Sequence, residues 1–126
     1  MKTNFTIITP SLNSGNKIQK CLDSVKSQKG VSVYHIIIDG GSTDNTIEIL
    51  NANLSNYKIL NGSSIYEALN YGYNESNSDL VGFLNCDDFY TSNDSLKKIY
   101  NAFKNNDSHD IFYGNCRFVN SKNKLL

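Results

Sequence analysis

The sequence shows no surplus of charge of either sign and no long apolar run. Its 126 residues carry twelve basic and twelve acidic side chains, so nothing in the composition favours nucleic acid as a partner. No stretch approaches the roughly 18 apolar residues of a membrane-spanning helix. The opening MKTNFTIITPSLN has too short an apolar run for a signal peptide. We therefore expect one cytoplasmic domain over residues 1–126.

Cysteine is scarce and its spacing is irregular. The three cysteines, Cys21, Cys86 and Cys116, are odd in number, and neither His35 nor His109 lies near a cysteine cluster. An intracellular chain of this kind keeps its thiols reduced. The pattern disfavours both a disulfide framework and a zinc site.

The glycine-rich signatures of common nucleotide-binding folds are also missing. The chain has neither a GxGxxG turn nor a phosphate-binding loop ending in Lys-Ser/Thr. A methyltransferase would have a glycine-rich turn after the first strand, where this chain has Pro-Ser-Leu-Asn at residues 10–13. A receiver-like phospho-acceptor domain would place a lysine near its carboxylates after a late strand, and none stands out. These classes are therefore disfavoured.

The chain does contain an alternation of strand-like and helix-like patterns. Short apolar runs predict strands over residues 5–9, 33–38, 58–60, 80–84, 111–113 and 117–119. Apolar side chains at helical spacing predict helices over residues 18–25, 47–50, 65–73 and 96–103. We expect Pro10 to end the first strand, Asp44 to cap the second helix, and Asn93 or Asp94 to cap the last. The alternation predicts an α/β three-layer sandwich, a mainly parallel sheet with helices on both faces.

Polar segments follow three of the predicted strands directly, at residues 10–13, 39–44 and 85–88. Because parallel strands end at the same edge of a sheet, we expect these segments to converge on one cleft. The adjacent carboxylates of Asp87 and Asp88 repel each other unless a cation lies nearby, and Mg²⁺ or Mn²⁺ is the ordinary one. The alternative is that they cap a turn and are solvated. Asp39, followed by two glycines, is suited to accept hydrogen bonds from a ribose or a base.

Three segments resemble, in order, the amino-terminal half of a family 2 glycosyltransferase with the GT-A (Rossmann-like) fold. They are ITPSLNSGNKIQKCLDSVKSQ, HIIIDGGSTDNTIEIL and SIYEALNYGYNESNSDLVGFLNCDD. The resemblance implies that the turn after the first strand lines the base and ribose, and that Asp39 bonds the base, expected to be uracil. It further implies that a helix borders the diphosphate and that a divalent ion, Mn²⁺ or Mg²⁺, is the cofactor. The nucleotide-binding residues implied are Pro10, Ser11, Leu12, Asn13, Asp39, Glu67, Asn70 and Asp87, with Asp88 as the metal ligand.

The chain departs from the family pattern at three positions and in length. Leu12 stands where Tyr or Phe is usual, Gly40 replaces a frequent Asp, and Asn85 replaces the first Asp of the acidic motif. Family members are about twice as long, and their second half supplies the acceptor site and the catalytic base. No residue here is assigned as that base, which we expect beyond residue 126, so the chain resembles a truncated nucleotide-sugar-binding part.

The resemblance implies transfer of a sugar from a nucleotide-diphosphate sugar, expected to be a UDP-sugar, to a saccharide or lipid-linked acceptor. Members often act in cell-surface polysaccharide synthesis, which would place the protein peripherally at the inner face of the membrane. The alternative is a non-catalytic nucleotide-sugar-binding fragment. A further possibility is a homodimer, in which a second copy covers the apolar surface that would otherwise face the second half.

Overall fold

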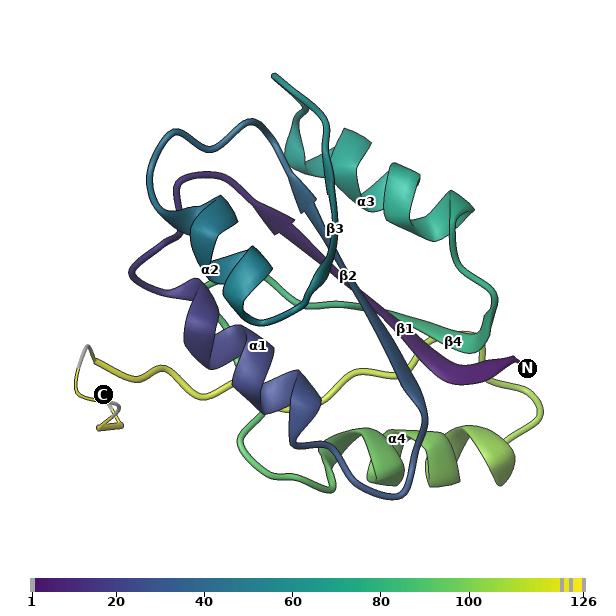
Figure 1. The fold of residues 1–126 in the computed structure, drawn as a ribbon. Helices are drawn as coiled ribbons and strands as arrows, with labels where there is room; N and C mark the ends of the chain where they lie inside the picture. Colours follow the sequence, from purple (N-terminus) through teal and green to yellow (C-terminus); the bar gives the residue numbers. More distant parts are fainter. Residues whose placement is uncertain (1, 121, 123, 126) are drawn as a thin grey trace.

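The computed structural model describes residues 2–120, 122, 124 and 125 and shows a parallel sheet between layers of helices (Figure 1). The strands are β1 (Thr3–Ser11), β2 (Val33–Asp39), β3 (Asn56–Ile59) and β4 (Ser78–Phe83). The helices are α1 (Ile18–Lys26), α2 (Thr46–Ala52), α3 (Ile65–Asn74) and α4 (Ser95–Lys104). The predicted α/β alternation is confirmed, with most boundaries within two residues of those expected.

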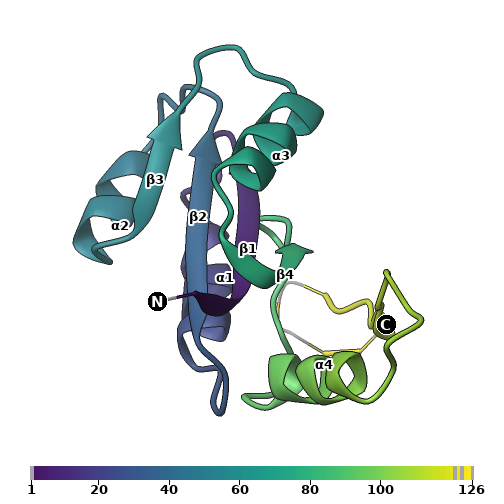
Figure 2. The same cartoon turned by 90° about the vertical axis from the view of Figure 1, so that its right-hand side faces the viewer.

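In the strand order β3-β2-β1-β4, the side on which strands are added to the sheet changes at β1. The chain first moves outward from β1 to β2 and β3, and then crosses to the other side of β1 to form β4. Because crossovers between parallel strands are right-handed, this reversal places α3 on the opposite face from α1 and α2. In Figure 2, α3 lies on the near side of the sheet and α1 on the far side.

The core has one apolar layer on each face of the sheet. On one face, Ile37 packs with Ile18 of α1 and Leu50 of α2, and all three are fully buried. On the other face, Ile8 and its neighbours in β2 pack against α3. Gly72 permits that approach, because a Cβ there would lie 2.6 Å from Cγ2 of Ile8. The helices are thereby fixed against the strands whose ends carry the polar segments.

The first strand does not end at Pro10 as expected but continues to Ser11. Alternate residues of a strand bond to opposite neighbours. The carbonyl of Ile8 accepts the Leu84 N–H on the β4 side, whereas that of Ser11 accepts the Gly40 N–H on the β2 side. Pro10 shares the direction of Ile8, and the pairing with β4 ends at Ile8. The missing N–H of Pro10 therefore falls where no strand needs it.

The two strands expected at 111–113 and 117–119 are not formed. This region has only an isolated bridge between Val119 and Leu125. Ile111 and Tyr113 are 81% and 92% exposed. A strand needs a neighbour for its backbone N–H and C=O groups, and in the described chain nothing pairs with the outer edge of β4. Apolar composition alone therefore misled the prediction. None of the described helices is long and apolar enough to span a membrane.

Candidate functional site

The segments that follow β1, β2 and β4 meet at the carboxyl edge of the sheet, as the sequence predicted. Together with the start of α3 they line a cleft of about 700 Å³. A cleft of this size suits a small ligand or cofactor. It lies where the strand order reverses, the usual ligand position in open α/β sheets. The lining residues are Pro10–Ser14, Asn16, Lys17, Ile38, Gly40, Ser63–Ile65, Ala68 and Asn85–Asp87.

Asn13 joins the segment after β1 to the segment after β2. Its side-chain oxygen accepts the N–H groups of Thr43 and Asp44 at 2.8 and 3.3 Å, and its own N–H donates to Ser42 Oγ at 2.8 Å. Asn13 holds a left-handed backbone with φ of 48°, which asparagine tolerates better than most residues. The side chain expected to contact a nucleotide is thus engaged in fixing two cleft walls together.

Asp44 strengthens the same junction from the other side. Its carboxylate accepts the Gly15 N–H at 3.0 Å and the Thr46 N–H at 2.9 Å, and also bonds the Thr46 hydroxyl. The Thr46 hydroxyl and these N–H groups lower the pKa of Asp44. Asp44 therefore caps the start of α2 as predicted, although Asn45 occupies the formal N-cap position.

Asp39 lies directly below the cleft and is fully buried. Its carboxylate accepts the N–H groups of Gly41 and Ser42 at 2.9 and 2.6 Å, and the Ser42 hydroxyl at 2.6 Å. The cleft wall itself is formed by the neighbouring Gly40, not by Asp39. In this structure Asp39 builds the turn that presents Gly40, and its direct contact with a base stays a prediction.

Glu67 and Asn70 are on α3 but are not part of the cleft wall. The Glu67 carboxylate accepts the Ser64 N–H at 2.7 Å, and Ser64 Oγ accepts the Glu67 N–H at 3.2 Å, which together form a capping box. The Ser64 N–H lowers the pKa of Glu67. Ile65 and Ala68 of the same helix do line the cleft. The expected position of Glu67 and Asn70 beside a diphosphate stays a prediction.

The acidic segment after β4 places Asp87 on the cleft wall, whereas Asp88 does not line the cleft. Both carboxylates are exposed. The Asp88 N–H donates to the Asn85 carbonyl at 3.0 Å, and the Asn85 amide approaches the Asp88 carboxylate at 3.4 Å. Cys86 of the same segment has its sulfur 3.0 Å from the Ser14 hydroxyl, and this contact joins the acidic segment to the one after β1.

The oxygen donors of this segment fit a hard divalent cation. No group of three His, Cys, Asp or Glu side chains able to hold a metal occurs within residues 2–120, 122, 124 and 125. Mg²⁺ and Mn²⁺ need fewer protein ligands, because one or two carboxylates suffice when water and substrate phosphates complete the coordination shell. Asp87 and Asp88 offer that minimal set at the edge of the cleft.

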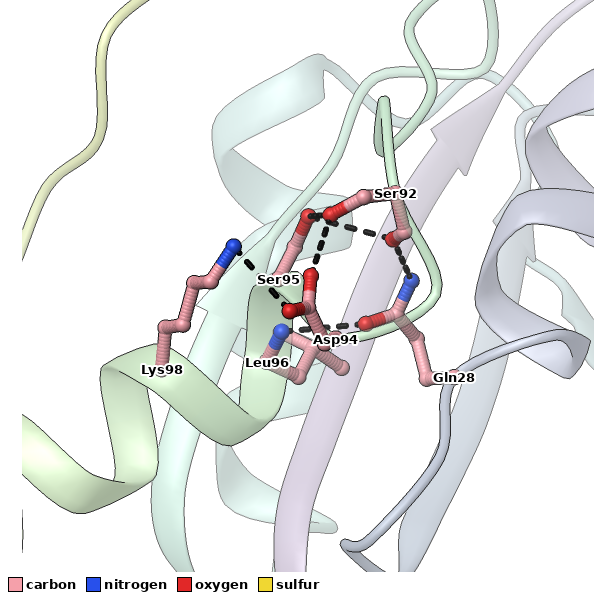
Figure 3. A network of polar contacts seen from close by, with 6 residues as sticks. All are labelled: Gln28, Ser92, Asp94, Ser95, Leu96 and Lys98. Atoms are coloured by element: carbon pink, nitrogen blue, oxygen red, sulfur yellow. Dashed lines mark hydrogen bonds and ion pairs between the residues drawn. The ribbon is translucent and has the colours of Figure 1, made fainter.

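Gln28, in the segment just after α1, holds the continuation of the acidic segment in place (Figure 3). Its amide donates to the Ser92 carbonyl at 2.7 Å and accepts the Leu96 N–H of α4 at 3.0 Å. Asp94 stands at the N-cap position but makes no capping bond. It accepts the Ser92 hydroxyl at 2.6 Å and pairs with Lys98 at 3.0 Å. The expected capping of α4 by Asn93 or Asp94 is therefore wrong, and the side chain of Gln28, distant in the sequence, takes this role.

Several cleft residues were not singled out from the sequence. Ser63, Ser64 and Ile65 line the cleft because the start of α3 lies over the carboxyl edge of the sheet. Lys17 lines it as the residue directly before α1. Its signal is positional, since Lys17 immediately precedes the first apolar residue of a helix that starts at this edge.

Solved structures of other proteins share this fold. S. aureus TarS 1-349 in complex with UDP-GlcNAc superposes with a TM-score of 0.70 at 23% identity, covering 82% of this chain and 32% of that one. The mannosyltransferase PcManGT from Pyrobaculum calidifontis, in complex with GDP-Man and Mn²⁺, gives a TM-score of 0.68 at 20% identity, with coverages of 82% and 32%. These likenesses confirm the expected GT-A fold.

Curated relatives carry related names. The PGL/p-HBAD biosynthesis glycosyltransferase of Mycobacterium tuberculosis is 31% identical over 116 residues, which are 87% of this chain and 45% of that protein. The chondroitin synthase of Pasteurella multocida is 29% identical over 126 residues, which are 96% of this chain and 13% of that protein. The chain thus spans less than half the length of these relatives.

The family model described as glycosyl transferase family 2 matches residues 6–125. The match includes all three cleft-forming segments after β1, β2 and β4. This chain therefore belongs to glycosyl transferase family 2.

Proposed function

We propose that the cleft binds a nucleotide-sugar donor, preferably a UDP-sugar, and that the whole protein transfers the sugar to a saccharide or lipid-linked acceptor. The observation that carries this proposal is the convergence of three strand-end segments on one cleft of about 700 Å³ with Asp87 in its wall. The UDP-GlcNAc named for the similar TarS structure supports the choice of donor class. The chondroitin synthase relative supports a role in polysaccharide synthesis.

The base and ribose lie, in this proposal, between the turn after β1 and the start of α3. Pro10 and Ser11 offer backbone groups, and Leu12, which is 58% exposed, offers an apolar surface to the base. Gly40 lies beside Leu12: a Cβ there would meet the Ser63 carbonyl oxygen at 3.5 Å and Leu12 Cδ1 at 3.6 Å, both ordinary van der Waals contacts. Asp87 accepts the ribose hydroxyls, since an ionised carboxylate is an acceptor on both oxygens.

The diphosphate lies, in this proposal, toward the acidic segment. Asp88, with Asp87 beside it, would hold a Mn²⁺ or Mg²⁺ ion. Such an ion, when bound, offsets the negative charge that develops on the departing diphosphate. The protein's own contribution is to hold both carboxylates at the cleft edge through the Cys86–Ser14 contact and the Asn85 turn.

Transfer with inversion also needs a base within hydrogen-bond reach of the acceptor hydroxyl. Among the described residues, Asp87 is the only carboxylate that lines the cleft, and the proposal uses it for the donor. We therefore assign no base within this chain. A non-catalytic nucleotide-sugar-binding module is the second candidate, favoured by the absence of a second carboxylate from that wall.

Calorimetric titration of UDP, GDP and dTDP, each with and without Mn²⁺, tests the donor assignment. We expect UDP to bind most tightly and Mn²⁺ to increase its affinity. No binding of any of the three nucleotides under either condition would refute the proposal. Incubating the chain with UDP-sugars and an acceptor, and measuring UDP release, then separates an enzyme from a binding module.

A further inference from the structure

We infer that Lys17 binds the diphosphate of the donor from the α1 side of the cleft. This inference rests on the proposed function, because it names a further contact of the same ligand. Lys17 would hold the diphosphate in position and add to its affinity, although it is not part of the acidic segment and was not singled out from the sequence.

The charges in the cleft wall lead to Lys17. Lys17 and Asp87 are the only charged side chains among the described residues that line the cleft. They lie on two segments, after β1 and after β4, that touch through Ser14 and Cys86. Lys17 is exposed, and the ion pairs of the described chain, formed by Lys2 and Lys98, do not include it. An ammonium group without a protein carboxylate, at the mouth of a cleft, is suited to an anionic ligand.

The neighbouring lysine of α1 is placed differently. The ammonium of Lys20 lies 3.6 Å from the ring centre of Phe89, over its face. Lys20 does not line the cleft. Of these two cations near the start of α1, only Lys17 is therefore available to a ligand in the cleft.

The local backbone favours an anion at the same place. Lys17 occupies the N-cap position of the nine-residue helix α1, no side chain caps this end, and the first turn has no acidic residue. The Ser14 carbonyl accepts the N–H groups of Lys17 and Ile18 at 2.9 Å, but the positive end of the helix dipole faces no acidic side chain of its own first turn. Independently, the cleft-lining Ser11 is only 6% exposed, and its hydroxyl has no hydrogen-bond partner. A buried hydroxyl without a partner is costly unless a ligand satisfies it.

Lys17 also balances the charges of the proposed complex. Asp87 and Asp88 bring negative charge to the edge of the cleft, and a divalent ion held by them would offset that charge. The Lys17 ammonium, on the segment after β1, contacts the phosphate oxygens directly. Part of the affinity for a diphosphate is therefore independent of the metal ion.

The test compares Lys17→Gln with Lys58→Gln, a matched loss of charge at an exposed position of β3 away from the cleft. Affinities for UDP and for uridine are measured by calorimetry in EDTA and in Mn²⁺. We expect Lys17→Gln to weaken UDP by about fivefold in EDTA, the size of a partly exposed charge contact, and to leave uridine unchanged. Lys58→Gln should match the wild type, and Lys17→Arg should restore most of the loss.

The outcomes separate this inference from the proposed function. Unchanged UDP affinity in Lys17→Gln, or an equal loss for UDP and uridine, would overturn the role of Lys17 while leaving the donor site in place. No nucleotide binding by the wild type would overturn both. Thermal unfolding of each variant shows whether the fold is retained, and Lys17→Met, which also removes the charge, carries the comparison if Lys17→Gln does not fold.

Discussion

Replacing Asn13 with alanine should both destabilise the fold and loosen the cleft. Asn13 fixes the segment after β1 to the segment after β2 through the N–H groups of Thr43 and Asp44. Alanine removes this acceptor and leaves a residue with a Cβ, but no compensating side chain, at a φ of 48°. Two effects therefore add at one position.

The size of the loss follows from these two effects. The exposed hydrogen bonds contribute roughly 0.5–1 kcal/mol in total. The left-handed backbone costs alanine about 1 kcal/mol more than asparagine. We therefore expect Asn13→Ala to lower the free energy of unfolding by about 2 kcal/mol, a large part of the stability of a typical small domain. Urea unfolding followed by circular dichroism measures the loss.

Two further variants of Asn13 separate the contributions. Asn13→Gly removes the acceptor but tolerates the left-handed backbone, so we expect it to recover part of the loss. Asn13→Asp keeps an acceptor and tolerates the same backbone, so it should remain close to the wild type. If Asn13→Ala proved as stable as Asn13→Asp, the side-chain junction between the two segments would not contribute to the fold, and the reasoning would be wrong.

Other predictions concern stability elsewhere in the fold. Burial lowers the pKa of His35 to about 4 from 6.5. The unfolded state therefore takes up a proton first as pH falls, and the free energy of unfolding should drop by about 2 kcal/mol between pH 7 and pH 5. Urea unfolding of His35→Gln should show no such drop. Gly40→Ala should change the free energy of unfolding by no more than about 0.5 kcal/mol. Gly41→Ala should lower it by roughly 1–2 kcal/mol, because Gly41 has a φ of 100° and its new Cβ would lie 2.6 Å from Asn61 Oδ1. Gln28→Ala leaves the Leu96 N–H without its acceptor and should lower the thermal midpoint, at a cost of about 1–3 kcal/mol.

The sheet, its helices and the convergence of three polar segments were predictable from the sequence. Apolar periodicity reports which residues face a core, and parallel strands must end at one edge. The isoleucines at 36–38 and the helical spacing of Ile18, Leu22 and Val25 therefore gave the correct elements. The strand over 111–113 failed because periodicity does not reveal whether a neighbouring strand exists.

The roles of individual polar side chains were harder to predict. Glu67 and Asp39 are expected to face a ligand, and that stays a prediction; in the structure their carboxylates bond the backbone beside them. Gln28 caps α4 from 68 residues away, which no local pattern shows. Lys17 lines the cleft only because α1 begins at the carboxyl edge. Such partners depend on tertiary geometry, whereas residue type and spacing report only the local chain.

The most direct test of the central claim is the dependence of UDP binding on Mn²⁺ in Asp88→Ala. Calorimetry should show that Mn²⁺ strengthens UDP binding by the wild type, and by the control Asp107→Ala, at an exposed residue that is not part of the cleft wall. In Asp88→Ala the metal should have no effect, while the unfolding temperature and the metal-free affinity stay unchanged. An equal gain from Mn²⁺ in Asp88→Ala and in the wild type would contradict the claim that this carboxylate holds the cation.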